Sequence, residues 1–298
     1  MEDNNGMVHS KLWIEEQIED FMGMRYRVDN VLFSGKSEFQ TVDVVETRGH
    51  GKMLLNDGLV MLTERDEFVY HDMITHVPLF THPKPKRVLV IGGGDGGTAR
   101  EVLRHNEVEF CKMVEIDKMV VDACVAHIPQ TAACLTQGDA RFELVIDDAV
   151  KYVAETKEKY DVIIVDSTDP IGPAQPLFGP KFYNDVFSCL NEDGLVVSQG
   201  ESPFYNQDMQ ESMYKVLGQF FPIVTSYNFT NLTYPGGYWS FTFASKKYHP
   251  IRDKDEQRVT SSELEFNYYN NDIHNACFVL PQFMRKNLDR YKKDNHAH

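Results

Sequence analysis

Four carboxylate-bearing segments of this sequence each come directly after an apolar run that is typical of a buried strand. They are Gly92–Gly97 with its Asp95, Glu115–Asp117, Asp147–Asp148, and Asp166–Pro170 with its Asp169. Because the carboxyl ends of parallel strands meet at one edge of a sheet, we expect these acidic side chains to line one cleft. Such a cleft attracts a cationic small molecule and offers a base that can accept a proton from an amine.

The glycine run after the first of these apolar runs fits a nucleotide ligand. It has the spacing G-x-G-x-x-G at Gly92, Gly94 and Gly97, which lets a nucleotide approach the backbone closely. Glu115 follows Asp95 by twenty residues and suits a carboxylate that accepts two ribose hydroxyls. NAD enzymes and adenosylmethionine enzymes both use such loops, so the pattern indicates an adenosine and leaves its identity open. The alternative for Glu115 is a solvated charge at a strand end.

Asp95 narrows the choice of adenosine ligand. A carboxylate inside the loop repels the pyrophosphate of NAD, or the carboxylate of adenosylmethionine, by about 1 kcal/mol or more at a separation of ~4 Å. It attracts an ammonium instead. The ligand that fits is decarboxylated adenosylmethionine, a sulfonium that carries an amine and no carboxylate. Asp95 could instead cap the helix that follows, and the two roles are compatible.

Asp166 and Asp169 lie three residues apart in a turn rich in proline and glycine. Two close carboxylates raise each other's pKa unless a cation compensates, and a diamine supplies such a cation. An attacking amine must first lose a proton, which costs about 4–5 kcal/mol at pH 7, and a carboxylate within hydrogen-bond reach can accept it. The composition of an ordinary turn would produce the same string, and this alternative stays open.

The residues after Pro85 alternate between strand and helix patterns, which predicts the sheet that positions these carboxylates. Strands are expected at 87–91, 111–116, 143–146, 161–165 and 195–198, and helices at 98–105, 118–126 and 150–160. Such alternation is typical of an α/β fold with a Rossmann-like (methyltransferase-type), mostly parallel sheet and helices on both faces. Residues 239–244 alternate like an antiparallel strand added at the edge of that sheet.

The first third of the chain reads as strands and turns, which predicts a small N-terminal β domain. Residues 52–55 and 59–62 flank Asn56-Asp57-Gly58, a hairpin signal, and a β-branched and aromatic run from Ser37 to Glu46 precedes them. A helix is expected from Asp66 to Val77, and the proline-rich segment 82–86 then marks a boundary. We therefore divide the chain into a strand and hairpin domain, residues 1–80, and a Rossmann-like catalytic domain, residues 81–298.

Charge and composition exclude several classes of partner. The 298-residue chain has 30 Lys and Arg against 45 Asp and Glu, a net charge of −15. Nucleic acids and anionic membranes need a basic footprint, which this balance does not provide. The start of the chain is acidic, unlike a signal peptide, and no apolar run reaches the ~18–20 residues that span a bilayer. Five scattered cysteines indicate buried thiols in a reducing compartment, so we expect a cytoplasmic protein.

Four motifs together resemble those of the polyamine aminopropyltransferases, closest to the members that make spermidine from putrescine. They are Thr63–Phe68, Gly92–Gly97, Val114–Asp117 and Asp166–Pro173, and the resemblance runs from the N-terminal hairpins to about Ser245. It implies a small β domain joined to a methyltransferase-like domain, assembled as a homodimer or homotetramer. It also implies a reaction without metal or cofactor, in which decarboxylated S-adenosylmethionine is a co-substrate. Its aminopropyl group passes to putrescine by direct displacement, giving spermidine and methylthioadenosine.

The resemblance assigns roles to individual residues. Asp166 is expected to accept the proton of the attacking amine, and Asp95 to hold the amine of the aminopropyl group. Glu115 is expected to bind the ribose, with the other substrate-binding positions at Gln40 and Pro173 (nucleoside), Asp147 and Asp148 (adenine side), Tyr70, His71 and Asp169 (polyamine channel), and Gln199 and Tyr234 (further pocket positions). Asp148 departs from the Asp-Gly pair that is common in this family.

The acceptor amine is less sharply defined than the donor. Agmatine, cadaverine and spermidine differ from putrescine in length or head group, and the far end of the pocket would select among them. Trp13, Tyr238 and Trp239 are candidates for that wall, and each would also fit as a core residue. The loop from Asp166 to Pro180, with four prolines and two glycines, is a candidate lid.

Three other classes of protein share parts of the pattern. A methyltransferase has the same fold but does not need Asp95. An NAD oxidoreductase has the same glycine spacing, but this sequence shows no evident acid for a hydride site. A non-catalytic polyamine-binding relative is expected to lack Asp95 or Asp166, and both are present.

Overall fold

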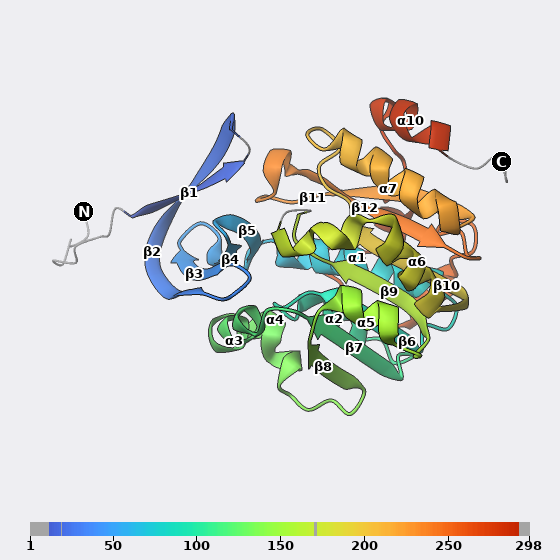
Figure 1. Ribbon diagram of the computed structural model, residues 1–298, viewed down its shortest axis with the longest axis horizontal. Coiled ribbons are helices and arrows are strands. Elements are labelled where there is room, and N and C mark those ends of the chain that lie inside the picture. The colour runs from blue at the N-terminus through green and yellow to red at the C-terminus, as the bar shows by residue number, and fades with distance from the viewer. Residues whose placement is uncertain (1–11, 19, 170–171, 292–298) are drawn as a thin grey trace.

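The computed structural model describes residues 12–18, 20–169 and 172–291. They form a five-stranded sheet of order β1-β2-β3-β4-β5 and a seven-stranded sheet of order β11-β12-β10-β9-β6-β7-β8. Figure 1 shows the small sheet on one side of the molecule, and the larger sheet with its covering helices on the other. The expected fold, a Rossmann-like sheet with an N-terminal β domain, is confirmed.

The small sheet is an antiparallel meander. Its strands are β1 (Trp13–Ile18), β2 (Met22–Lys36), β3 (Thr41–Thr47), β4 (Gly51–Asn56) and β5 (Leu59–Thr63). The expected hairpin is confirmed, and Asp57 and Gly58 at its turn have φ of 48° and 82°, as a tight hairpin turn requires. β3 starts at Thr41 rather than Ser37, because the Ser37 hydroxyl accepts hydrogen bonds from two following backbone N–H groups and closes a turn.

The larger sheet has a parallel centre. Strands β6 (Arg87–Gly92), β7 (Phe110–Glu115), β8 (Phe142–Ile146), β9 (Tyr160–Asp166) and β10 (Leu190–Gln199) run parallel, with β6 between β9 and β7. Residues 88–91 of β6 are fully buried, the pattern of a strand covered on both faces. All five strands that the sequence predicts here are present, and their carboxyl ends share one edge of the sheet.

The antiparallel strand near the C-terminus is one position further inside than expected. β12 (Tyr238–Ser245) is antiparallel, as predicted, but it lies between β10 and β11 (Ile223–Thr230). β11 therefore forms the edge. The prediction placed β12 at the edge because β11, with its mixed polar and apolar side chains, was not recognised as a strand.

The helices cover both faces of the larger sheet. They are α1 (Glu67–Thr81), α2 (Gly97–Leu103), α3 (Lys118–His127), α4 (Pro129–Ala132), α5 (Ala149–Glu155), α6 (Pro180–Cys189), α7 (Gln207–Phe220), α8 (Glu256–Ser261), α9 (Asn271–Cys277) and α10 (Gln282–Leu288). Short 3-10 turns are η1 (Ala133–Leu135), η2 (Gly172–Phe178), η3 (Pro235–Gly237) and η4 (Asp289–Tyr291). The helix expected at 150–160 ends at Glu155, because β9 already starts at Tyr160.

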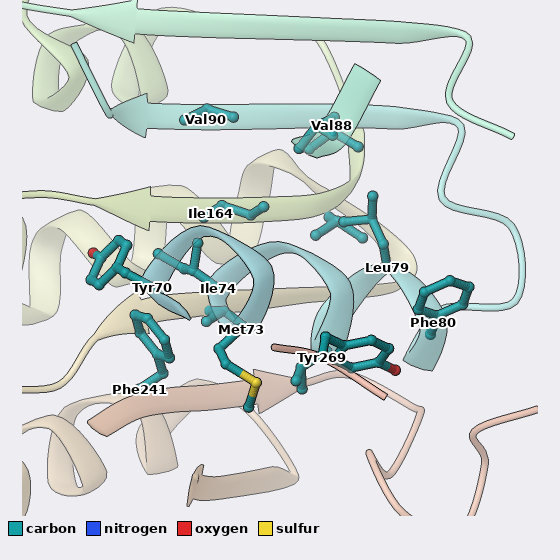
Figure 2. Packing of buried hydrophobic residues seen from close by; sticks show 14 of the residues in the cluster. Tyr70, Met73, Ile74, Leu79, Phe80, Val88, Val90, Ile164, Phe241 and Tyr269 are labelled. Carbon is teal, nitrogen blue, oxygen red and sulfur yellow. The ribbon is translucent and has the colours of Figure 1, made fainter. Parts of the chain in front are cut away.

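Helix α1 packs into the core of the larger sheet. All of its residues from 69 to 81 are buried, and it continues through Pro78 beyond the expected end at Val77. Figure 2 shows Met73 and Ile74 of α1 packed between the parallel strands and Phe241 of β12. Burial of each such side chain contributes about 1.5–3 kcal/mol. The first turns of α1 are thereby fixed beside the ends of β6 and β9. The division of the chain at residue 80 stays a prediction.

The five cysteines agree with the expectation from the sequence. All five cysteines are buried and carry free thiols. Within the described ranges, no helix combines the length and the apolar character needed to cross a bilayer.

Candidate active site

A cavity of about 200 Å³ opens at the edge of the larger sheet where β6, β7 and β9 end. Its opposite wall comes from strands β4 and β5 of the small sheet. Ten of the twelve predicted site residues line it: Gln40, Tyr70, His71, Asp95, Glu115, Asp148, Asp166, Asp169, Gln199 and Tyr234. The structure thus brings together side chains from both sheets, while their chemical roles stay predictions.

The remaining two predicted residues are Asp147 and Pro173. Asp147 lies outside the wall of the cavity, and one of its carboxylate oxygens accepts a hydrogen bond of 2.8 Å from the backbone N–H of Asp148. Asp148 itself caps α5 through the backbone N–H of Val150. The side chain of Pro173 lies outside the described residues, as do residues 170–171 of the candidate lid, the loop from Asp166 to Pro180.

The glycine run packs against the end of β9. Gly92 and Gly93 have φ of 79° and 71°, and the N–H of Gly93 donates to the backbone carbonyl of Asp166 at 2.9 Å. A Cβ on Gly92 would lie 2.2 Å from that same oxygen. These two glycines are therefore required to bring the loop against Asp166, in a backbone conformation that side chains disfavour.

Asp95 makes the helix-end contact that the sequence offered as one of its roles, and it also faces the cavity, while its binding of a ligand stays a prediction. Its Oδ1 accepts a hydrogen bond of 2.8 Å from the backbone N–H of Gly97, the first residue of α2. The same oxygen lies 3.2 Å from Nε2 of His71, and Asp95 also faces the cavity. Both contacts within the described chain use Oδ1, so Oδ2 is available to a ligand.

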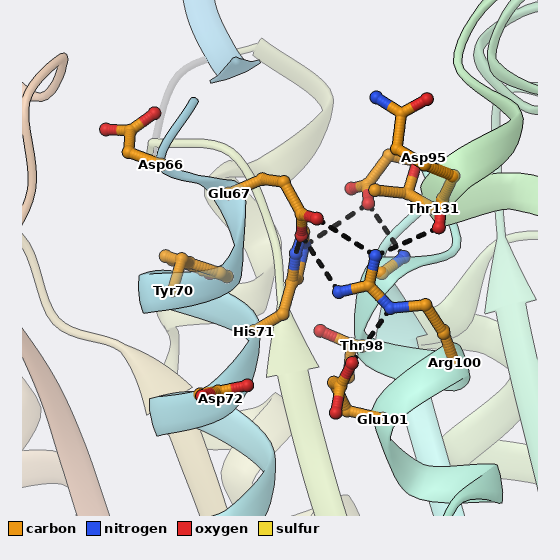
Figure 3. Close-up of polar contacts among 12 residues, drawn as sticks. Asp66, Glu67, Tyr70, His71, Asp72, Asp95, Thr98, Arg100, Glu101 and Thr131 are labelled. Carbon is orange, nitrogen blue, oxygen red and sulfur yellow. Dashed lines mark hydrogen bonds and ion pairs between the residues drawn. The ribbon is translucent and has the colours of Figure 1, made fainter. Parts of the chain in front are cut away.

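His71 lies between two carboxylates in the position shown in Figure 3. Its Nδ1 is 2.5 Å from Glu67 Oε2, one helical turn earlier on α1, and its Nε2 faces Asp95. Burial alone would lower the pKa of His71, but the charges and hydrogen bonds of Asp95 and Glu67 outweigh it and raise the pKa to about 10. Arg100 of α2 binds both oxygens of Glu67, at 3.0 and 2.9 Å. Sequence reasoning missed Glu67, although its spacing of four residues from His71 on a helix was readable.

Asp166 ends β9 at the centre of the cavity wall. Its Oδ1 accepts a hydrogen bond of 2.8 Å from the Tyr70 hydroxyl, and its Oδ2 one of 2.7 Å from the Thr98 hydroxyl. Burial, and then the negative charge of Asp95, raise the pKa of Asp166 to about 6. The charge of His71 and the two hydroxyl hydrogen bonds act in the opposite direction. A carboxyl with a pKa near neutral is suited to accept a proton and release it again.

Glu115 ends β7 in a corner tied to the small sheet. Burial raises its pKa to about 7, although its Oε1 accepts a hydrogen bond of 2.8 Å from the N–H of Asp117. Asp117 in turn accepts hydrogen bonds from Ser37, at 2.7 Å, and from the Gln40 amide, at 3.0 Å. The turn between β2 and β3 is thereby fixed against the end of β7, which places Gln40 on the wall beside Glu115.

A second acidic group surrounds Asp169. The amide of Gln199 donates to Asp169, at 3.2 Å, and to Glu201, at 2.7 Å. Glu16 of β1 also lines the cavity, and its Oε1 accepts a hydrogen bond of 2.8 Å from the N–H of Val60. Burial raises the pKa of Glu16 to about 7, and burial followed by the charge of Asp169 raises the pKa of Glu201. Glu16 was missed because only the folded small sheet brings β1 to the cavity.

Tyr234 belongs both to the cavity wall and to the core. Its hydroxyl donates to the backbone carbonyl of Met61 at 2.8 Å, and its ring packs edge-on against Tyr70 at 5.9 Å. Trp239 packs against the ring of Tyr234 and lines the cavity. It is the one of the three predicted wall candidates that is found there. Trp13 is instead half exposed on β1, and it and Tyr238 lie outside this wall.

The acidic cluster could be considered for a metal ion. Ligand atoms of His71, Asp95 and Asp166 lie within 4.8 Å of one another. However, both ring nitrogens of His71 face carboxylates, and a doubly protonated ring has no lone pair for a metal. This donor set therefore favours an amine cation over a metal, and a reaction without metal stays a prediction.

Two protein-family models match consecutive parts of the chain, from residue 12 to residue 255. A spermidine synthase tetramerisation domain matches residues 12–64, and a spermine/spermidine synthase domain matches residues 67–255. Among curated proteins, a polyamine aminopropyltransferase of Alkaliphilus oremlandii is 47% identical over 282 residues, which cover 94% of this chain and 99% of the relative. A polyamine aminopropyltransferase of Methanocaldococcus jannaschii is 45% identical, over 92% of this chain and 94% of the relative.

Solved structures give the same result. A spermidine synthase in complex with the transition-state analogue AdoDATO superimposes with a TM-score of 0.91 at 41% identity, over 94% of this chain and 95% of that one. The spermidine synthase of Thermotoga maritima superimposes with a TM-score of 0.89 at 41% identity, over 94% of both chains.

Proposed function

The chain belongs to the spermine/spermidine synthase family of aminopropyltransferases, and on that premise we propose that it makes spermidine from putrescine. The donor in this proposal is decarboxylated S-adenosylmethionine, and methylthioadenosine is the second product. The observation that carries the proposal is the distribution of carboxylates along one cavity. Asp95 and Asp166 form one acidic group with His71, and Asp169 and Glu16 form another.

The two acidic groups suit the two ends of a diamine. An unreactive ammonium would bind at Asp169 and Glu16, because a cation there would favour the charged form of Glu16, whose pKa burial raises to about 7. The reacting amine would lie at Asp166, whose raised pKa allows it to take up a proton as the bond to carbon forms. The separation of these groups thereby favours an acceptor with an amine at each end.

The proposed reaction is a direct displacement on the carbon next to the sulfonium. The amine nitrogen forms a bond to that carbon, the carbon–sulfur bond breaks, and its electron pair stays on sulfur, which becomes a neutral thioether. Asp166 takes the proton that the amine loses. Holding the two reactants in line can contribute about 7–11 kcal/mol, so we assign most of the acceleration to positioning.

The donor would bind across the strand ends. In this proposal Asp95 holds the ammonium of the aminopropyl group, and Glu115 accepts hydrogen bonds from the ribose hydroxyls. Support for both comes from their places on the cavity wall beside the glycine run. The proposed nucleoside contacts are completed by Gln40, Pro173 and Asp148, and the acceptor contacts by Tyr70, His71, Gln199 and Tyr234. Asp147, which lies outside the wall, would reach the adenine side only beyond the cavity described above.

Mass spectrometry of the products tests the proposed acceptor. The protein is incubated with decarboxylated S-adenosylmethionine and, in separate reactions, putrescine, cadaverine, agmatine or spermidine. We expect equimolar spermidine and methylthioadenosine with putrescine, and slower turnover with the other three amines. If turnover were faster with any of those three amines, that amine and not putrescine would be the preferred acceptor. Methylated products from ordinary S-adenosylmethionine would instead identify a methyltransferase.

We also propose a homodimer or homotetramer in the cytoplasm. Support for the oligomer comes from the match of residues 12–64 to a tetramerisation domain. The buried free thiols agree with a reducing compartment. Sedimentation equilibrium measures the assembly directly, and a monomer at micromolar concentration would contradict the oligomer.

A further inference from the structure

Helices α1 and α2 are joined by an ion-pair network that reaches the cavity. Arg100 binds Glu67 through both terminal guanidinium nitrogens, and its Nε donates to Glu101 at 2.8 Å. The Glu67 side chain is only 9% exposed, so its charge is poorly screened by solvent. Figure 3 shows Arg100, Glu67 and His71 in sequence, leading to Asp95.

The contacts of His71 require a proton on each ring nitrogen. Nδ1 meets a carboxylate oxygen of Glu67, and Nε2 meets one of Asp95. A neutral imidazole carries one N–H and one lone pair, so one of these contacts would set a lone pair against a carboxylate. The imidazolium donates to both. With the ring 2% exposed, water cannot replace either partner.

Gly97 makes room for this ring. A Cβ on Gly97 would lie 2.2–2.4 Å from three atoms of the His71 imidazole. Gly97 does not have the positive φ of Gly92 and Gly93, so a side chain is excluded here by contact with His71 rather than by the backbone. The last glycine of the motif and the histidine therefore form one packed unit.

Charged groups face His71 from every neighbouring element. Glu67 lies on α1 itself, Asp95 on the loop before α2, and Asp166 at the end of β9. Arg100 on α2 is reached through Glu67. Thus one imidazolium is surrounded by three carboxylates, and Arg100, which binds one of them, is shared with Glu101.

We propose that Glu67, held by Arg100, is a positioning and specificity-determining residue that keeps His71 an imidazolium and balances its charge. The imidazolium fixes Oδ1 of Asp95, which leaves Oδ2 for an ammonium. Because Glu67 cancels the charge of His71, Asp95 still presents a net negative charge to the cavity. The site thereby prefers a donor that ends in an amine to one that also carries a carboxylate. This last step rests on the proposed function, whereas the protonation of His71 does not.

Histidine NMR tests the protonation without any substrate. In the ligand-free wild-type protein labelled on its histidines, a His71→Gln variant identifies the His71 signals. We expect both ring nitrogens of His71 to remain protonated through pH 9, in line with its pKa of about 10. In Glu67→Gln, the new amide can donate to Nδ1 and permits a neutral ring. The midpoint of the His71 titration should then lie about two to three pH units lower than in wild type.

Glu109→Gln is the matched control, because Glu109 is an exposed partner of Lys86 outside the cavity. It should leave the His71 titration unchanged. A wild-type midpoint near 6.5, the ordinary value, would overturn the proposal even if the Glu67 variant did not fold. A Glu67→Gln midpoint equal to that of wild type would overturn it as well.

Competition binding tests the specificity step. We measure the ratio of the Kd values for S-adenosylmethionine and its decarboxylated form in wild type and in Glu67→Gln. At pH 6 the variant keeps the imidazolium without its counter-charge, so discrimination against the carboxylate should fall on the order of fivefold to tenfold. It should recover by pH 9, where the ring is neutral. An equal loss of discrimination at pH 6 and at pH 9 would refute the proposal that Glu67 balances the charge of His71.

The two experiments separate this inference from the proposed function. If neither donor binds to wild type, the proposed function fails while the titration still decides the state of His71. If the donor binds and reacts but His71 titrates normally, the proposed function holds and the inference fails.

Discussion

Thr98→Val changes the proposed base of this site through a single hydrogen bond. The Thr98 hydroxyl donates to Oδ2 of Asp166 at 2.7 Å, and Thr98 is completely buried. Valine has nearly the same shape and removes only the hydroxyl. Oδ1 of Asp166 keeps its hydrogen bond from Tyr70.

The size of the expected pKa change follows from the charge of the Asp166 carboxylate, which accepts the hydrogen bond from Thr98. A hydrogen bond to a charged group contributes about 1.5–3 kcal/mol, and one pKa unit corresponds to about 1.4 kcal/mol. Since the bond stabilises the carboxylate, its loss should raise the pKa of Asp166 from about 6 by about one to two units. At pH 6 the deprotonated fraction then falls about fivefold to fiftyfold, while at pH 9 it is unchanged within about 10%.

The assay is the pH dependence of kcat/KM for the acceptor, followed as methylthioadenosine release at saturating donor. The ratio of variant to wild type cancels the ionisation of the amine itself. We expect this ratio to be low at pH 6 and to approach one by pH 9. Thr98→Ser keeps a hydroxyl and should follow the wild type. A ratio that does not depend on pH would refute the reasoning, because it would reduce Thr98 to a packing role.

Two further predictions concern stability. Asp72→Asn should destabilise the protein by about 1.5–3 kcal/mol and increase hydrogen exchange at residues 267–269, because Oδ2 of buried Asp72 accepts three backbone N–H groups there, at 3.1, 2.8 and 3.1 Å. Hydrogen exchange at residues 267–269 that is as slow in the variant as in wild type would contradict this prediction. The ligand-free protein should also gain thermal stability as pH falls from 8 to about 6.5, above the range in which the buried histidines with lowered pKa values (His82, His105 and His274) act in the opposite direction. Glu16 and Glu115 both have folded-state pKa values raised to about 7, so protons bound in this range favour the folded state, and a thermal midpoint that falls throughout the range would contradict that sign.

The parallel strands and the acidic residues at their ends were predictable because the signals are local. An apolar run followed by glycine or aspartate indicates a buried strand and its end, and parallel strands always end together. Asp95, Glu115 and Asp166 could therefore be assigned to one cleft without knowing the order of the strands. The hairpin at Asp57-Gly58 is equally local, since its turn requires those residue types.

The surroundings of those residues depend on contacts between distant segments. Thr98 meets Asp166 only after α2 has packed beside β9, and Glu16 reaches the cavity only through the pairing of the small sheet. β12 was placed at the edge because the polar residues of β11 concealed a strand. Some partners that set these pKa values, such as Thr98 for Asp166, therefore lie outside the motifs, even where the motifs name the titrating residue.

Turnover of Asp166→Asn tests most directly whether Asp166 is the base of an aminopropyl transfer. The variant keeps the size of the side chain and its hydroxyl partners, but an amide cannot accept the proton of the amine. With decarboxylated S-adenosylmethionine and putrescine, kcat should fall by about 10²- to 10⁴-fold, while the Kd of methylthioadenosine, measured by calorimetry, stays within about threefold of wild type. Wild-type turnover in this variant would contradict the account.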